Sequence, residues 1–85
     1  MTNVLLSADG DVKVYSVPGV VAKNLETICM EFSSKGGCFD ETDFIEWLNK
    51  YKYPHEKSLY VENIGWCQDE KDIPLKYREC KWFNF

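Results

Sequence analysis

The stretch FDETDFIEWLNKYKYP, residues 39–54, carries the clearest local signal in the chain and decides how the rest is interpreted. Asp40 is of the residue type that caps helix N-termini, and Pro54 prevents a helix from continuing. Phe39 and Phe44 are spaced as a hydrophobic staple around that cap. Between the two ends, apolar side chains recur at helical spacing and predict one buried stripe: Phe44, Ile45, Trp47, Leu48 and Tyr51. The stretch therefore predicts an amphipathic helix that runs from the cap to the proline.

Two β-type runs precede this helix and are joined by a short turn. The runs 4–6 and 12–17 flank Asp9-Gly10, a pair that favours a type I′ turn because it accepts positive φ at both central positions. These features predict a hairpin over residues 3–17. After it, apolar residues at helical spacing predict a second amphipathic helix: Val20, Val21, Leu25, Ile28, Cys29 and Phe32.

Two further strands are predicted in the C-terminal half. Residues 58–66 are rich in aromatic and β-branched side chains, which favours a strand. Residues 68–72 predict a charged turn, and residues 79–85 alternate partly, with Cys80 and Trp82 on one side of an extended chain. The order β-β-α-α-β-β predicts an α+β fold in a single domain, a small and mostly antiparallel sheet with two helices packed on one face.

Aromatic side chains are more numerous than two short helices can bury. The residues concerned are Tyr15, Tyr60, Trp66, Phe83 and Phe85. We expect some of them to stay exposed, and exposed aromatic side chains beside acidic groups are typical of a protein-binding face. The alternative is that they pack among themselves at the sheet edge.

The composition is that of a small soluble domain with an acidic balance. Fourteen acidic residues against ten basic ones give 85 residues a net charge of −4. Direct binding to nucleic acid is not predicted, because phosphate contacts need clustered Lys and Arg. No apolar run approaches the roughly 20 residues of a membrane span, and the N-terminal stretch lacks the basic region of a secretion signal. We expect a cytoplasmic protein, a monomer or weak dimer, whose partner is a basic protein surface.

Two acidic groups are the predicted partner-binding residues: Glu41, Asp43 and Glu46 in the helix, and Asp69, Glu70 and Asp72 in the charged turn. Because the apolar stripe of the helix must face the sheet, the three helical carboxylates are expected to point away from the core. Clustered acids of this kind complement a surface of Lys and Arg. The alternative is that both groups are only solvated surface.

Four cysteines are split between the two halves of the chain: Cys29, Cys38, Cys67 and Cys80. One structural zinc ion bound by these thiolates would stabilise a domain whose core is small. The sequence contains no Cys-x-x-Cys pair, so free thiols and a disulfide are the alternatives. His55 could replace one thiolate, or it is simply a loop residue.

A catalytic function is not predicted. The single histidine and the cysteines are accompanied by no glycine-rich oxyanion loop, and the sequence has no phosphate loop. Asp40 and Asp43 share one side of the predicted helix, which suits capping better than acid–base chemistry. We therefore expect a binding protein that is not an enzyme.

The overall profile resembles that of small proteins of phages and mobile elements. The chain is short, acidic and aromatic-rich, with the segments Ile73-Pro74-Leu75-Lys76-Tyr77 and Trp82-Phe83-Asn84-Phe85 near its end. Among the proteins that it resembles are anti-CRISPR inhibitors. The resemblance implies a stoichiometric inhibitor in a bacterial host, which blocks nucleic-acid loading by a type II effector nuclease. It would occupy a nucleic-acid channel lined with Lys and Arg, or a recognition lobe. These families share no motif, so no residue role is carried over. The alternative is a zinc-stabilised adaptor or regulatory subunit that binds a cellular protein.

Overall fold

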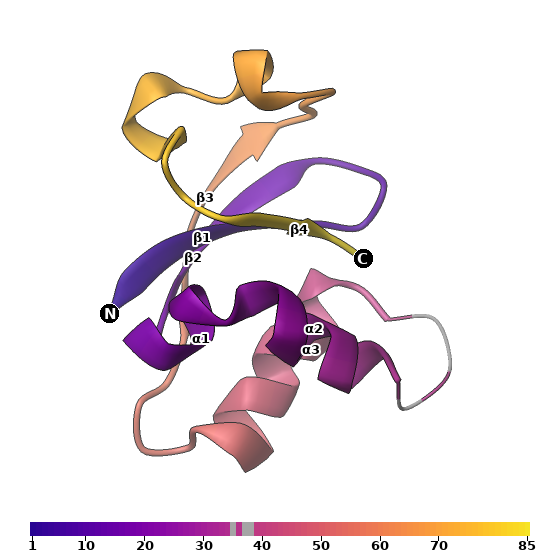
Figure 1. Cartoon of the computed structure of the whole chain (residues 1–85), viewed down its shortest axis with the longest axis vertical. Coiled ribbons are helices and arrows are strands. Elements are labelled where there is room, and N and C mark those ends of the chain that lie inside the picture. Colours follow the sequence, from indigo (N-terminus) through magenta and orange to yellow (C-terminus); the bar gives the residue numbers. More distant parts are fainter. Residues whose placement is uncertain (35, 37–38) are drawn as a thin grey trace.

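A computed structural model describes residues 1–34, 36 and 39–85. Four strands form one sheet in the order β3-β2-β1-β4, with the bounds β1 Thr2–Ser7, β2 Val12–Val17, β3 Leu59–Gly65 and β4 Trp82–Asn84. The helices α1 (Gly19–Lys23), α2 (Leu25–Ser33) and α3 (Glu41–Trp47) lie on one side of this sheet, and residues 66–81 lie on the other (Figure 1). The predicted α+β class, with its helices on one face of a small sheet, is confirmed.

The predicted hairpin is confirmed, but its turn is not type I′. Strands β1 and β2 pair antiparallel, and the four residues 8–11 connect them. Asp9 has a φ of 56°, whereas Gly10 does not adopt positive φ. The backbone N–H of Asp9 donates to Asn84 Oδ1 at 2.9 Å, and Asn84 Nδ2 donates to Asp9 Oδ1 at 3.0 Å. The left-handed backbone of Asp9 is thus stabilised by a partner that lies 75 residues away in the sequence.

Strand β4 makes the sheet mixed rather than antiparallel throughout. It pairs parallel with β1, so that Leu5 lies beside Trp82 and Leu6 beside Phe83. The alternation predicted for this strand is confirmed, since Trp82 packs on one face of the sheet while Phe83 and Phe85 pack on the helix side. The C-terminal aromatic side chains therefore contribute to both faces.

The predicted second helix is two helices. Asn24 breaks it with a φ of −117° and a ψ of 34°, between α1 and α2. Its side-chain Nδ2 donates to the carbonyl oxygen of Val20 at 3.0 Å. Asparagine competes in this way for backbone groups and interrupts helices. The chain turns at this point, and α2 then continues to Ser33.

The helix predicted from the cap to the proline begins as expected. Asp40 and Asp43 form a reciprocal capping box, and α3 continues as a π-helical turn, η1 (Leu48–Lys52). Tyr51 was predicted in the buried stripe, and this prediction is wrong because its side chain is 74% exposed. The π-helical turn contains more residues per turn than an α-helix, so a step of three residues from Leu48 no longer returns to the same side.

Two hydrophobic clusters fill the two faces of the sheet. The helix-side core consists of Val4, Leu6, Tyr15, Val17, Val21, Ala22, Leu25, Ile28, Cys29, Phe32, Phe44, Ile45 and Leu48. The second core consists of Leu5, Val12, Val14, Cys67, Ile73 and Tyr77. Alternate residues of β1 and β2 belong to different cores, as the period of a strand requires. The two central strands therefore carry a hydrophobic core on each face.

Candidate functional site

Two pockets flank the β1–β2 turn and share Gly10. The first has a volume of about 390 Å³ and is lined by Ala8, Gly10, Asp11, Lys13, Asp40, Glu41 and Asn63. The second has a volume of about 460 Å³ and is lined by Ser7, Asp9, Gly10, Trp66, Cys67, Gln68, Trp82 and Asn84. The carboxylates of the turn and of the first turn of α3 are called here the acidic turn end: Asp9, Asp11, Asp40, Glu41 and Asp43.

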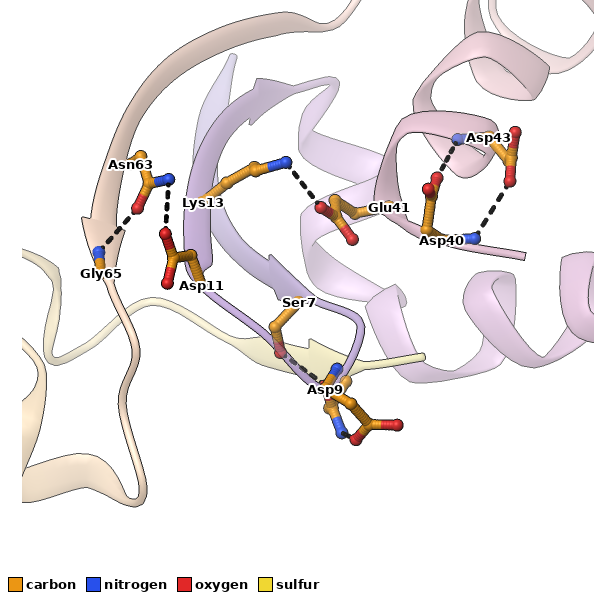
Figure 2. A network of polar contacts seen from close by, with 10 residues as sticks. Ser7, Asp9, Asp11, Lys13, Asp40, Glu41, Asp43, Asn63 and Gly65 are labelled. Carbon is orange, nitrogen blue, oxygen red and sulfur yellow. Dashed lines mark hydrogen bonds and ion pairs between the residues drawn. The ribbon is translucent and has the colours of Figure 1, made fainter. Parts of the chain in front are cut away.

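Glu41 does not point to solvent as predicted. The residue is only 6% exposed, and its Oε1 atom lies 2.9 Å from Lys13 Nζ (Figure 2). Lys13 lies opposite Leu6 in the sheet and therefore projects to the side that the helices cover. The first turn of α3 places Glu41 over this lysine, and the hydrogen bond between them is the main cause of the raised pKa of Lys13. Glu41 Oε2 is buried and has no hydrogen-bond donor among the described residues.

Asp11 and Asp40 of the first pocket and Asp43 of α3 are exposed, and hydrogen bonds hold their side chains in place. Asp40 Oδ1 accepts from the backbone N–H of Asp43 at 3.0 Å, and Asp43 Oδ2 accepts from the backbone N–H of Asp40 at 3.1 Å. The bond from the Asp43 backbone is the main cause of the lowered pKa of Asp40. Asp11 Oδ2 accepts from Asn63 Nδ2 at 3.1 Å, which ties the turn to β3 (Figure 2).

The other predicted partner-binding residues lie elsewhere. Glu46 is exposed and pairs with Lys50 at 3.0 Å along the helix. In the charged turn, now the 3₁₀ helix η2 (Glu70–Asp72), Asp69 and Asp72 accept hydrogen bonds from the backbone of their own segment. This turn and α3 lie on opposite sides of the sheet (Figure 1). The two predicted acidic groups are therefore not brought together in one surface.

Sequence reasoning missed Asp9 and Asp11 as members of the site. Both lie in a turn that was treated only as a connection, and only the folded chain shows that this turn approaches the start of α3. The Asp-Gly signal located the turn but carried no information about its neighbours. Some of the five aromatic residues were predicted to stay exposed, and this is confirmed: Tyr60 and Trp66 are 57% and 65% exposed, whereas Tyr15 is 4% exposed.

The cysteines are divided between the two faces of the sheet. Cys29 is fully buried in the helix-side core, and this burial raises its pKa to about 12. Cys67 and Cys80 pack in and against the second core, where burial also raises the pKa of each thiol. Cys38 lies outside the described residues. Cys29, Cys67 and Cys80 are free thiols.

The zinc site proposed from the four cysteines stays a prediction. Across residues 1–34, 36 and 39–85, no group of three or more His, Cys, Asp or Glu side chains is placed to hold a metal ion. A site built from all four thiolates would have to join Cys29 to two thiols on the opposite face. Metal analysis of protein purified without added zinc tests it: the prediction requires one zinc per chain, and metal-free folded protein would contradict it.

Comparison of the chain with protein-family models, with curated proteins and with solved structures found no match. In the part of the chain that the structure describes, no helix combines the length and the apolar character that crossing a membrane requires. Carboxylates that hydrogen bonds fix at one end of the molecule suit the recognition of cationic groups.

Proposed function

We propose that the protein is a non-enzymatic binding protein whose acidic turn end docks onto a basic protein surface. The observation that carries this proposal is the convergence of carboxylates from the β1–β2 turn and the start of α3 on one end of the molecule. Lys13 is the one basic side chain among the residues described as lining the first pocket, and it is already paired with Glu41. The first pocket is therefore left with negative charge from Asp11 and Asp40, and Asp9 and Asp43 are two and three residues from them in the chain.

The carboxylates are held in place before any partner arrives. Asp40 and Asp43 bind each other's backbone, Asp11 binds Asn63, and Asp9 binds Asn84. Little side-chain freedom remains to be lost on binding, which favours affinity. Opposite charges on the partner would raise the association rate and make it sensitive to salt.

A partner of this description is a protein with a channel for nucleic acid, since such channels are lined with Lys and Arg. We propose that the protein acts in the cytoplasm of a bacterial host as a stoichiometric inhibitor of a nucleic-acid-directed nuclease of the CRISPR type. The charge pattern of the acidic turn end and the overall profile of the chain support this class of partner. The carboxylates would occupy positions that phosphates of the guide or target otherwise take.

The experiment adds purified protein to a type II effector nuclease before or after the guide RNA. Inhibition of guide loading and of target cleavage is expected when the protein is added first, with saturation near one protein per nuclease. The test variant carries Asp11→Asn, Asp40→Asn and Asp43→Asn, which remove charge and keep an acceptor oxygen at each position. It should inhibit less.

A matched control removes the same number of negative charges outside the acidic turn end. Glu26→Gln, Glu56→Gln and Glu79→Gln change three exposed residues and should leave inhibition intact. If the two triple variants behave alike, binding depends on net charge and not on this site. If the unaltered protein neither binds nor inhibits the nuclease, the nuclease is not its partner.

A further inference from the structure

The second pocket beside the β1–β2 turn is lined by residues of a different kind from those of the first pocket. Two tryptophans line it: Trp66 is 65% exposed, and Trp82 is half-buried. Three residues with polar side chains, Asp9, Gln68 and Asn84, also line it. Among the described residues that line this pocket there is no Lys or Arg, so no cation of the chain itself occupies it.

One wall of this pocket is fixed by a chain of hydrogen bonds. Trp82 Nε1 donates to Ser7 Oγ at 3.0 Å, and Ser7 Oγ donates to Asn84 Oδ1 at 2.8 Å. Asn84 Nδ2 in turn donates to Asp9 Oδ1 at 3.0 Å. Figure 2 shows Ser7 at the end of β1 and Asp9 in the turn that follows it. The hydrogen bonds of a buried serine and one asparagine therefore fix the Trp82 ring relative to the Asp9 carboxylate.

Trp66, the second tryptophan of this pocket, is an indole that the fold leaves in solvent. Trp66 directly follows β3, and Gly65 with a φ of 83° turns the chain there. A tryptophan exposed to this extent contributes little to the core. In protein interfaces, tryptophan is among the residues most often responsible for binding energy.

We propose that this pocket binds an arginine side chain of the partner, with the guanidinium against the indole of Trp66 and paired with Asp9. The proposal rests on the proposed function, because it takes the partner to be basic. A planar guanidinium can stack on an aromatic ring and donate to a carboxylate at the same time, whereas the compact ammonium of lysine cannot do both as well. Tryptophan is also the aromatic side chain that attracts cations most strongly.

The test measures binding of four probes to the full chain by calorimetry. The probes are hexa-arginine, hexa-lysine, hexa-citrulline and the neutral sugar maltohexaose. Citrulline has the shape of arginine without its charge. We expect hexa-arginine to bind more tightly than hexa-lysine, and hexa-citrulline and maltohexaose to bind weakly or not at all.

Two variants locate the binding in this pocket. Trp66→Ala should weaken hexa-arginine binding by about tenfold, as expected for the loss of a cation–π contact, and Asp9→Asn should weaken it too. Tyr51→Ala is the matched control, because Tyr51 is an aromatic residue of similar exposure on η1 and should not matter. Thermal unfolding of each variant checks that the fold is intact.

The outcomes separate this inference from the proposed function. If the Asp11, Asp40 and Asp43 triple variant loses hexa-arginine binding while Trp66→Ala retains it, the pocket is not an arginine site and the proposed function stands. If hexa-arginine does not bind the unaltered protein, the arginine assignment is overturned, whereas the proposed function is decided by the nuclease assay. Binding of maltohexaose in place of the peptides would show a carbohydrate site and contradict the arginine assignment.

Discussion

The helix-side core and the second core bury opposite faces of the same sheet, but different kinds of chain cover them. Amphipathic helices cover the first, and their aromatic side chains make ring contacts, such as Phe32 with Trp47 at a centroid distance of 5.2 Å. Residues 66–81 cover the second with two 3₁₀ turns, η2 and η3 (Leu75–Tyr77). Arg78 Nη2 there donates to the carbonyl oxygen of Ile73 at 3.0 Å.

The difference shows that this small domain buries the two faces of its sheet in two ways, under helices and under an irregular segment. A helix satisfies its own backbone and needs only an apolar stripe, whereas an irregular segment needs side chains to satisfy its backbone groups. We therefore expect the helix-side core to supply most of the stability, and the second cover to relax more easily when a side chain is removed. Substitutions in the two cores test this expectation.

Phe44→Ala should have the largest effect. Its side chain is fully buried and its ring contacts those of Phe32, Trp47 and Phe85. The loss of a buried aromatic ring should lower the free energy of unfolding by about 3–5 kcal/mol, measured by urea denaturation. Phe44→Leu serves as the control and should cost less, because it leaves a smaller cavity.

Ile73→Ala makes the corresponding change in the second core. Ile73 is 3% exposed. We expect the irregular segment that carries it to move toward the space left behind. We expect a loss of about 2 kcal/mol in the free energy of unfolding, near the lower end for this kind of substitution. A loss as large as that of Phe44→Ala would show that the two faces are equally rigid.

Glu41→Gln and Glu46→Gln compare a buried and an exposed carboxylate on one helix. Glu41→Gln leaves Lys13 facing a neutral amide in place of a carboxylate and should lower the free energy of unfolding by about 1–2 kcal/mol. The Glu46 substitution should change it by less than about 0.5 kcal/mol, because the pair with Lys50 is exposed. Equal effects in thermal or urea unfolding would contradict the assignment of Glu41 to the structure.

Asp40→Ala should cost about 1 kcal/mol through loss of the helix cap. The pKa of Asp40 is lowered in the folded protein, so the stabilisation by its ionised form is present above the ordinary value of 3.8 and is lost as pH falls through the lowered value. Asp40→Asn keeps a capping side chain but cannot titrate. Urea denaturation at decreasing pH should therefore show a smaller loss of stability for Asp40→Asn than for the unaltered protein.

The sequence was sufficient for the features that depend on local pattern. The helix from Asp40, the hairpin and the strand at Leu59–Gly65 follow from capping, periodicity and residue type. The parallel pairing of β4 with β1 and the cover of the second face were not predicted, because both depend on contacts between residues far apart in the sequence.

The candidate site was predicted only in part, for the same reason. Asp43 was expected on the surface and is exposed there, but Glu41 was expected in solvent and is buried over Lys13. Whether a side chain in the first turn of a helix is buried depends on the strand against which that turn packs. Asp9 and Asp11 became part of the site only because the turn that carries them folds beside the start of α3 and the end of β4.

The claim that the acidic turn end is the binding surface is tested most directly by nuclear magnetic resonance. Backbone amide signals of ¹⁵N-labelled protein are followed during titration with a lysine-rich peptide at low salt. We predict that the shifted signals are concentrated in residues 8–13 and 39–43 and that the shifts diminish as salt is added. Shifts concentrated in the charged turn of residues 69–72 or along β3, with residues 8–13 and 39–43 unchanged, would contradict the account.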